Sequence, residues 1–225
     1  MEKIVVLTGA GISAESGIKT FRDADGLWEG HDIMEIASPQ GWTKNPTKVL
    51  NFYNIRRRQL LEVKPNAAHM AIVELERKYD VNIITQNIDD LHERAGSKNV
   101  LHLHGELLKV RSCEDEEIIL DWKKDVNPGD LCPRKSQLRP HVVWFGEAVP
   151  MFPVAAEITQ QADILIIIGT SMQVYPAASL MDFKKENASV YFIDPKPAIP
   201  PHPSVKIIQK NAVKGVVELV NDLLQ

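Results

Sequence analysis

Two histidines, His102 and His104, stand two positions apart in a stretch that has the composition of a β-strand. Because alternate residues of a strand share one face, both imidazoles would point the same way. That spacing suits a pair of metal ligands, since neutral imidazole is a common metal ligand. A histidine taken singly is more often an exposed residue or a satisfied core residue. The spacing by itself therefore leaves both interpretations open.

Polar side chains also follow two apolar runs. Asn87 and Asp89 come after the run 81–85, and the triplet Gly169-Thr170-Ser171 follows the run 164–168. Polar residues at such places usually form caps or turns. The carboxyl edge of a parallel sheet is also where α/β proteins bind ligands. A turn role and a ligand-binding role are compatible here.

A glycine-rich turn follows the first predicted strand and reads Gly9-Ala10-Gly11-Ile12-Ser13-Ala14. Glycines at this spacing let backbone amides approach a diphosphate at the start of a helix. The same residues would also suit a tight turn that packs closely. The acid that dehydrogenases place about twenty positions later is missing. The turn indicates a nucleotide site without favouring an ordinary dehydrogenase.

Three consecutive arginines occur in the stretch FYNIRRR, which belongs to a predicted helix over 46–61. Tyr53 and Arg56 are three residues apart, so on a helix they lie side by side, whereas Arg57 and Arg58 point elsewhere. The simplest interpretation of such a run is solvated surface charge. A tyrosine hydroxyl beside a guanidinium could instead bind an anionic group.

Length and composition restrict the class of protein. The chain has 225 residues, a formal net charge of −4, 44% hydrophobic residues and only two cysteines. It is long enough to bury a sizeable core, and no basic stripe suggests a general nucleic-acid binder. No run is long enough to span a membrane or serve as a signal peptide. We expect a cytoplasmic protein without disulfides, and favour a monomer.

Strand-like runs alternate with helical patterns along the chain. The predicted strands cover 3–8, 81–85, 100–104, 163–168, 189–194 and 205–209. Alternation of this kind predicts an α/β fold, a Rossmann-like parallel sheet with helices on both faces. Two insertions, about 29–65 and 109–140, would form a smaller lobe. The nucleotide-binding lobe would comprise about 1–28, 66–108 and 141–225 of a single catalytic domain.

Taken together, the motifs resemble those of the sirtuins, the NAD-dependent protein deacylases. The matching segments are 8–18 (TGAGISAESGI), 21–22 (FR), 26–28 (GLW), 85–92 (TQNIDDLH), 95–96 (AG), 104–105 (HG), 142–147 (VVWFGE) and 169–171 (GTS). They occur in the family's order over most of the chain. The resemblance implies that NAD is consumed as a co-substrate.

The resemblance implies a role for each motif. His104, an imidazole expected near its ordinary pKa, would be the general base, and Asn87 would hold the ribose and a water molecule. Attack of the acyl oxygen on the ribose would release nicotinamide, and O-acyl-ADP-ribose would follow. The implied NAD-binding residues are Gly9, Ala10, Gly11, Ser13, Phe21, Arg22, Trp28, Gln86, Asn87, Ile88, Asp89, Gly169, Thr170, Ser171, Asp194 and Ala212.

The resemblance also implies how the substrate is held. The block 142–147, which alternates like an edge strand, would pair with the extended peptide through Val143, Phe145, Gly146 and Glu147. The Tyr53 and Arg56 pair is similar to that of the class III branch, which removes succinyl, malonyl or glutaryl groups from lysine. The expected partners are therefore acylated lysines in proteins, with acetyl-lysine as a secondary substrate.

Most sirtuins bind a structural zinc ion through two CxxC pairs, and both pairs are broken here. Cys113 is followed three residues on by Glu116, and Cys132 by Lys135. A closed zinc site needs about four ligands, so we expect none, with weak binding by two thiolates as the alternative. Two other functions remain open, mono-ADP-ribosyl transfer and NAD binding without catalysis. Retention of His104 favours deacylation over both.

Overall fold

A six-stranded parallel sheet forms the centre of the computed structural model, which describes residues 1–19, 27–28, 30–198 and 202–225. Its strands run in the order β11-β10-β9-β1-β4-β5. Their bounds are Val205–Ile208, Ser189–Ile193, Ile164–Ile168, Lys3–Thr8, Asp80–Thr85 and Val100–His102. All six predicted strands are present, but β5 ends at His102, so His104 lies beyond the strand predicted over 100–104. The apolar run of β9 is buried at every position, as expected for a strand covered on both faces.

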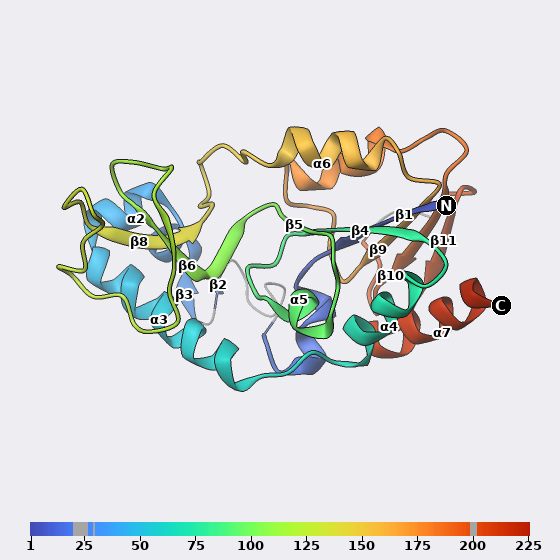
Figure 1. Ribbon diagram of the computed structural model, residues 1–225, viewed down its shortest axis with the longest axis horizontal. Coiled ribbons are helices and arrows are strands. Elements are labelled where there is room, and N and C mark those ends of the chain that lie inside the picture. Colours follow the sequence, from blue (N-terminus) through green and yellow to red (C-terminus); the bar gives the residue numbers. More distant parts are fainter. Residues whose placement is uncertain (20–26, 29, 199–201) are drawn as a thin grey trace.

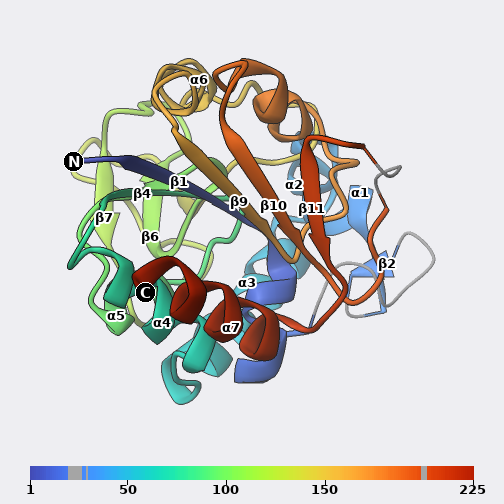
Figure 2. The same cartoon turned by 90° about the vertical axis from the view of Figure 1, so that its right-hand side faces the viewer.

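Helices cover both faces of this sheet (Figures 1 and 2), which confirms the predicted α/β fold. Ile4 and Val6 of β1 face α4 (Ala67–Leu75) and α7 (Ala212–Leu224). Val5 and Leu7, which alternate with them, face α6 (Phe152–Thr159) and the 3₁₀ helix Ala177–Phe183. The sheet therefore separates two apolar cores. In the described part of the chain, no helix has the length and apolar composition needed to cross a bilayer.

A smaller unit lies beyond the carboxyl ends of the strands of this sheet (Figure 1). It contains an antiparallel sheet in the order β7-β6-β8 and a short β2-β3 hairpin. The strand bounds are Ile119–Asp121, Gly105–Ser112, Leu138–Val142, Leu27–Trp28 and His31–Asp32. Its helices are α1 (Ile33–Ile36), α2 (Pro39–Lys44) and α3 (Pro46–Glu62). Helix α5 (Leu91–Ala95) follows β4 and packs against α4. Strand β6 crosses residue 108, which we predicted to end the second segment, 66–108, of the larger lobe.

Helix α3 packs against strands β6 and β8 of this unit. Asn45 caps it by accepting a hydrogen bond from Lys48 N, and Pro46 occupies its first turn. Val49, Tyr53 and Leu60 are buried among residues of β6 and β8. The helix predicted over 46–61 is confirmed.

The edge strand predicted over 142–147 is wrong beyond Val142, where β8 ends. The chain turns instead, because Glu147 N donates to the carbonyl of Trp144 at 3.0 Å and Gly146 takes a positive φ of 92°. The amide of Phe145 donates to Ala37 O at 2.9 Å, across the small unit. The alternation of apolar residues thus arises from packing in a turn and not from a strand.

Candidate functional site

A cavity of about 1010 Å³ lies at the carboxyl edge of the central sheet, where the loops after β1, β4, β9 and β10 meet α3 and the loop after β8. Open parallel sheets bind their ligands at this edge. The predicted residues that line it are Gly9, Ala10, Gly11, Trp28, Tyr53, Arg56, Gln86, Asn87, Ile88, Asp89, His104, Val143, Phe145, Gly146, Glu147, Gly169, Thr170, Ser171, Asp194 and Ala212. The structure therefore brings residues of the predicted NAD-binding set and of the predicted substrate-binding set into one cavity.

Among the described residues, Ser13 is the predicted cofactor-binding residue that does not line the cavity. Phe21 and Arg22 lie outside the described residues. Ser13 is fully buried, and its hydroxyl donates to Asp89 Oδ2 at 2.9 Å. Ser13 therefore supports the wall from behind.

The glycine-rich turn packs backbone against backbone with the loop after β9. Gly11 N donates to Gly169 O at 2.8 Å, and a Cβ on Gly11 would lie 2.5 Å from the Cα of Gly169. A Cβ on Gly9 would lie 2.8 Å from Gly169 O. The turn forms two short 3₁₀ helices, Ala10–Ile12 and Ala14–Ser16, in place of the helix start that we expected. The glycines thus serve close packing and keep the cavity wall free of side chains.

Asn87 and Asp89 are tied together beneath the cavity. The side-chain amide of Asn87 donates to Gly9 O and to Ser13 Oγ, each at 3.2 Å. Ser13 passes a hydrogen bond on to Asp89, whose other oxygen accepts from Leu91 N at 3.2 Å. Burial raises the pKa of Asp89 to about 6, against the effect of these hydrogen bonds. The carboxyl group can therefore change protonation near neutral pH, and the turn role and the cavity role coexist.

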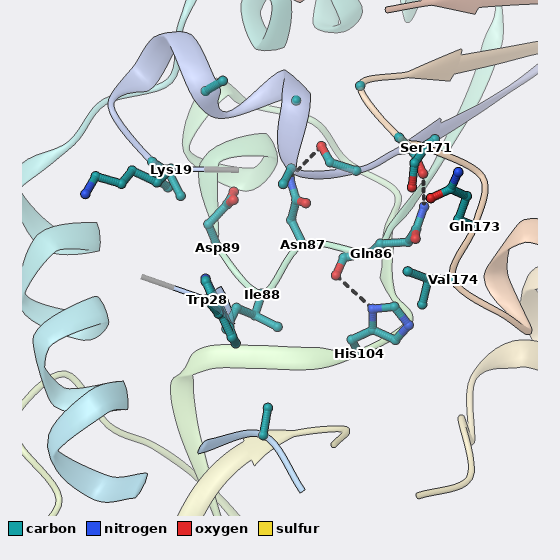
Figure 3. Close-up of a pocket in the computed structure, with 18 of the residues that line it drawn as sticks. Lys19, Trp28, Gln86, Asn87, Ile88, Asp89, His104, Ser171, Gln173 and Val174 are labelled. Carbon is teal, nitrogen blue, oxygen red and sulfur yellow. Dashed lines mark hydrogen bonds between the residues drawn. The ribbon is translucent and has the colours of Figure 1, made fainter. Parts of the chain in front are cut away.

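His104 faces the cavity from the bend between β5 and β6 (Figure 3). Its Nδ1 lies 3.0 Å from the carbonyl oxygen of Gln86. Since a carbonyl only accepts, Nδ1 carries the hydrogen and Nε2 of the neutral ring is left as a base. Burial lowers the pKa of His104, with partial opposition from the Gln86 hydrogen bond. The pKa of His104 is therefore lower than the ordinary value that we expected.

His102 is held at both ring nitrogens by other parts of the protein. Its Nδ1 lies 3.1 Å from Asn87 O and its Nε2 lies 2.7 Å from Glu93 Oε1. Burial acts to lower the pKa of His102, but the hydrogen bond and charge of Glu93 raise it overall. Both ring nitrogens of His102 are thus engaged by protein groups, an arrangement that does not favour a metal-binding pair with His104. Among the residues that the structure describes, no three His, Cys, Asp or Glu side chains gather as a metal site.

Tyr53 and Arg56 lie together at the end of the cavity formed by α3. Tyr53 is fully buried, its hydroxyl accepts from Trp144 Nε1 at 3.1 Å, and burial raises its pKa. The guanidinium carbon of Arg56 lies 5.4 Å from the centroid of the Phe52 ring. The pair supplies a hydroxyl and a cation in an otherwise largely apolar recess.

The two neighbouring arginines have unlike positions. Arg57 is fully buried, with Nε donating to Leu107 O at 3.1 Å and Nη1 to Asn54 Oδ1 at 2.8 Å. Burial lowers its pKa to about 10. Arg58 is exposed and pairs with Asp125. Solvated surface charge is therefore correct for Arg58 and wrong for Arg57, which joins α3 to β6.

Glu147 fixes the loop that follows β8. Its carboxylate accepts from Trp144 N at 2.8 Å and pairs with Arg139 at 2.8 Å and Arg111 at 3.2 Å. Val143 N donates to His104 O at 2.9 Å, which ties the same loop to the bend between β5 and β6. The loop is thus held at both ends, by Val143 at its start and by Glu147 at its end, and these contacts fix the position of its backbone beside the cavity.

At the far end of the cavity, Asp194 follows β10 and is 2% exposed. Its Oδ1 accepts from Lys196 N at 2.8 Å. Ala212, the first residue of α7, closes this end with its small side chain. Thr170 Oγ1 accepts from Gln86 Nε2 at 3.1 Å, which links the loops after β9 and β4.

The cavity also has lining residues that sequence reasoning missed. They include Glu15, Ile18, Lys19, Leu107, Gln173, Val174 and Lys196. Gln173 and Val174 stand just after the triplet 169–171 (Figure 3), and that proximity is a signal that could have found them. Nothing in the sequence around Leu107 or Lys19 distinguishes them.

The two cysteines are both free. Cys113 is exposed, whereas Cys132 is buried with its thiol 3.4 Å from Ser112 Oγ. The expectation that the chain holds no structural zinc stays a prediction.

Comparison with known proteins gives a consistent result. A model of the Sir2 family matches residues 9–176. A Helicobacter pylori protein named NAD-dependent protein deacylase is 62% identical over 226 residues, covering 100% of this chain and 99% of that protein. A Bacteroides thetaiotaomicron protein of the same name is 51% identical over 227 residues, covering 97% of each.

Solved structures agree with these relatives. A Sir2 homologue in complex with NAD is 41% identical with a TM-score of 0.90, covering 99% of this chain and 89% of that chain. A Sir2 protein bound to acetylated peptide is 28% identical with a TM-score of 0.81, covering 97% and 92%.

Proposed function

This chain belongs to the Sir2 family, and on that premise we propose that it is an NAD-dependent protein lysine deacylase that favours acidic acyl groups. The observation that carries the proposal is the cavity itself. His104, with its Nε2 free to act as a base, shares this cavity with Tyr53 and Arg56. A base and an anion-binding pair in one space are what deacylation of an acid-bearing lysine requires.

The residues at the sheet edge fit NAD. Gly9 and Gly11 present bare backbone to the cavity, and a Cβ on either would clash with the loop after β9. Bare backbone is what lets a diphosphate approach the amides. Thr170, Ser171 and Asp194 would bind the adenosine half. Asn87, Ile88 and Asp89 would border the ribose and nicotinamide. When bound, NAD supplies the ribose carbon that receives the acyl oxygen, and nicotinamide leaves.

His104 would act on the proton of a ribose hydroxyl. The Gln86 carbonyl fixes the tautomer and the ring orientation, so Nε2 accepts that proton without rearrangement. The lowered pKa keeps Nε2 unprotonated at neutral pH. Asn87, tied to Gly9 and Ser13, would hold the ribose and the water that completes the reaction. The products would be free lysine, nicotinamide and O-acyl-ADP-ribose.

Tyr53 and Arg56 would determine the acyl group. A succinyl- or malonyl-lysine ends in a carboxylate that must leave water to enter the recess, and a guanidinium and a phenol hydroxyl can replace that water. Hydrogen bonds to charged groups contribute roughly 1.5 to 3 kcal/mol each. Acetyl-lysine is smaller and would still enter. The loop 143–147 would hold the extended substrate peptide through its main chain.

The test uses purified protein, NAD and a matched set of succinyl-, malonyl-, glutaryl- and acetyl-lysine peptides, with nicotinamide and O-acyl-ADP-ribose measured by mass spectrometry. We expect Arg56→Met to reduce desuccinylation by tens to hundreds of fold and to change deacetylation by only a few fold. Arg58→Met is the matched control, because Arg58 lies two residues on, exposed and paired with Asp125. Equal losses of both activities in Arg56→Met would refute the assignment of the acyl pocket.

A further inference from the structure

The hydroxyl of Tyr53 has one hydrogen-bond partner within the described part of the chain, the indole nitrogen of Trp144. Trp144 Nε1 lies 3.1 Å from the phenol oxygen, and both residues line the cavity. An indole N–H can donate but cannot accept. The phenol oxygen must therefore be the acceptor in this contact. Its own hydrogen is left for an acceptor that the described residues do not supply.

The indole ring is held firmly in this position. The guanidinium carbon of Arg139 lies 3.7 Å from the centroid of the Trp144 ring, and the ring of Trp42 packs at 5.7 Å. Arg139 is in turn paired with Glu147 at 2.8 Å, and the backbone amide of Trp144 donates to the same carboxylate at 2.8 Å. A cation over the face of an indole is attracted to its π-electrons. The contact with Tyr53 is thus supported by three buried or half-buried groups.

We propose that Trp144 is a specificity-determining positioning residue, which turns the hydroxyl of Tyr53 so that its hydrogen is presented to the carboxylate of an acidic acyl group. The inference rests on the proposed acyl pocket of Tyr53 and Arg56. An acetyl group has no acceptor at that position. The N–H of Trp144 should therefore matter for succinyl-lysine and not for acetyl-lysine.

The test removes the N–H while keeping an aromatic ring. Trp144→Phe should lower kcat/KM for a succinyl-lysine peptide about three- to tenfold, mainly through KM, because one neutral hydrogen bond is at stake. Deacetylation should fall less, because an acetyl group has no carboxylate to accept from Tyr53, so the ratio of desuccinylation to deacetylation should drop about three- to tenfold. The deacetylation rate also reports that the variant is folded.

Two further variants separate this role from packing. Trp42→Phe removes the same atoms from the tryptophan that packs on Trp144, but it leaves the donor to Tyr53 in place, so it should not change the ratio of the two activities. In a Tyr53→Phe background there is no hydroxyl to orient. Trp144→Phe should then have no further effect on desuccinylation.

The outcomes are distinguishable. If Trp144→Phe lowers both activities equally, or if its effect adds fully to that of Tyr53→Phe, the positioning role is overturned while the acyl pocket stands. If the wild type shows no preference for succinyl-lysine and Arg56→Met changes nothing, the acyl pocket fails and this inference fails with it. Should Trp144→Phe not fold, benzothienylalanine at position 144 replaces the N–H by sulfur in a ring of the same shape. The same selective loss is expected for it.

Discussion

The Nδ1 atom of His104 lies 3.0 Å from the carbonyl oxygen of Gln86, and this contact sets the tautomer of the ring. The next carbonyl, that of Asn87, holds Nδ1 of His102 in the same way at 3.1 Å. The two rings differ at Nε2, where His102 meets the carboxylate of Glu93 and His104 faces the cavity. The pKa values of two histidines on one short segment are thereby shifted in opposite directions, upward for His102 and downward for His104.

The first prediction concerns the titration of these rings. We expect the pKa of His104 to lie below 6.5 because of burial, and that of His102 to lie above 6.5 because of Glu93. NMR of the ring carbon-bound protons measures both, with the His104 signal assigned by its loss in His104→Gln. His102 in the same sample is the internal control. A His104 signal that titrates above that of His102 would contradict the prediction.

His104→Gln should also abolish most of the deacylation. Removal of a general base typically costs about 10²- to 10⁴-fold in rate. Thermal unfolding of the variant should remain close to that of the wild type, because the side chain makes a single hydrogen bond. A variant that keeps more than a tenth of the activity would exclude the role of base for this residue.

A second prediction concerns stability in acid. His69 and His92 are buried side by side, with ring centroids 5.0 Å apart, and His92 Nε2 lies 3.1 Å from Thr8 Oγ1. Burial lowers the pKa of His69 to about 4 and that of His92 well below 6.5. Between pH 6.5 and 4 the unfolded chain binds more protons than the native one, so the free energy of unfolding falls as the pH falls. His69 alone would contribute roughly 3 kcal/mol over this window.

Urea unfolding at pH 7 and pH 5 measures this effect. His69→Gln should flatten the decline, whereas His202→Gln, at an exposed histidine, should leave it unchanged. Asp89 acts in the opposite direction. Its pKa is raised from 3.8 to about 6 in the folded protein, so its contribution to the free energy of unfolding falls as the pH rises through that range. An equally steep decline in His69→Gln and the wild type would show that His69 is not the group responsible.

The third prediction concerns metal. Incubation with a strong chelator should leave the melting temperature unchanged, because Cys113 and Cys132 have no third ligand group near them in the described residues. A structural zinc ion contributes directly to folding, so its removal lowers the melting temperature strongly. A marked decrease, reversed by added zinc, would overturn the metal-free expectation.

The strands of the central sheet were predictable because burial on both faces leaves a direct trace in composition. The run Ile164–Ile168 is apolar without alternation, which is typical of a central strand buried on both faces. The side-by-side placement of Tyr53 and Arg56 followed from helical spacing alone. Both inferences use only neighbours in the chain.

Contacts between distant segments explain what could not be predicted. Arg57 is buried because the carbonyl of Leu107, on a strand of the small unit, accepts from its side chain. No local pattern distinguishes it from the exposed Arg58. The prediction of a strand beyond Val142 was wrong for the same reason. The geometry of the turn found there depends on contacts with Arg139, Arg111 and Ala37, which lie outside it.

The contact between Gly11 and Gly169 has a consequence for how the sequence can vary. A side chain added to either glycine would meet the backbone of the other, at 2.5 Å in one direction and 2.6 Å in the reverse. Most steric defects can be relieved by shrinking the neighbour, but here both neighbours already have the smallest residue. No second-site change at the partner can therefore rescue a substitution, and the two positions, far apart in the chain, are fixed as a single unit.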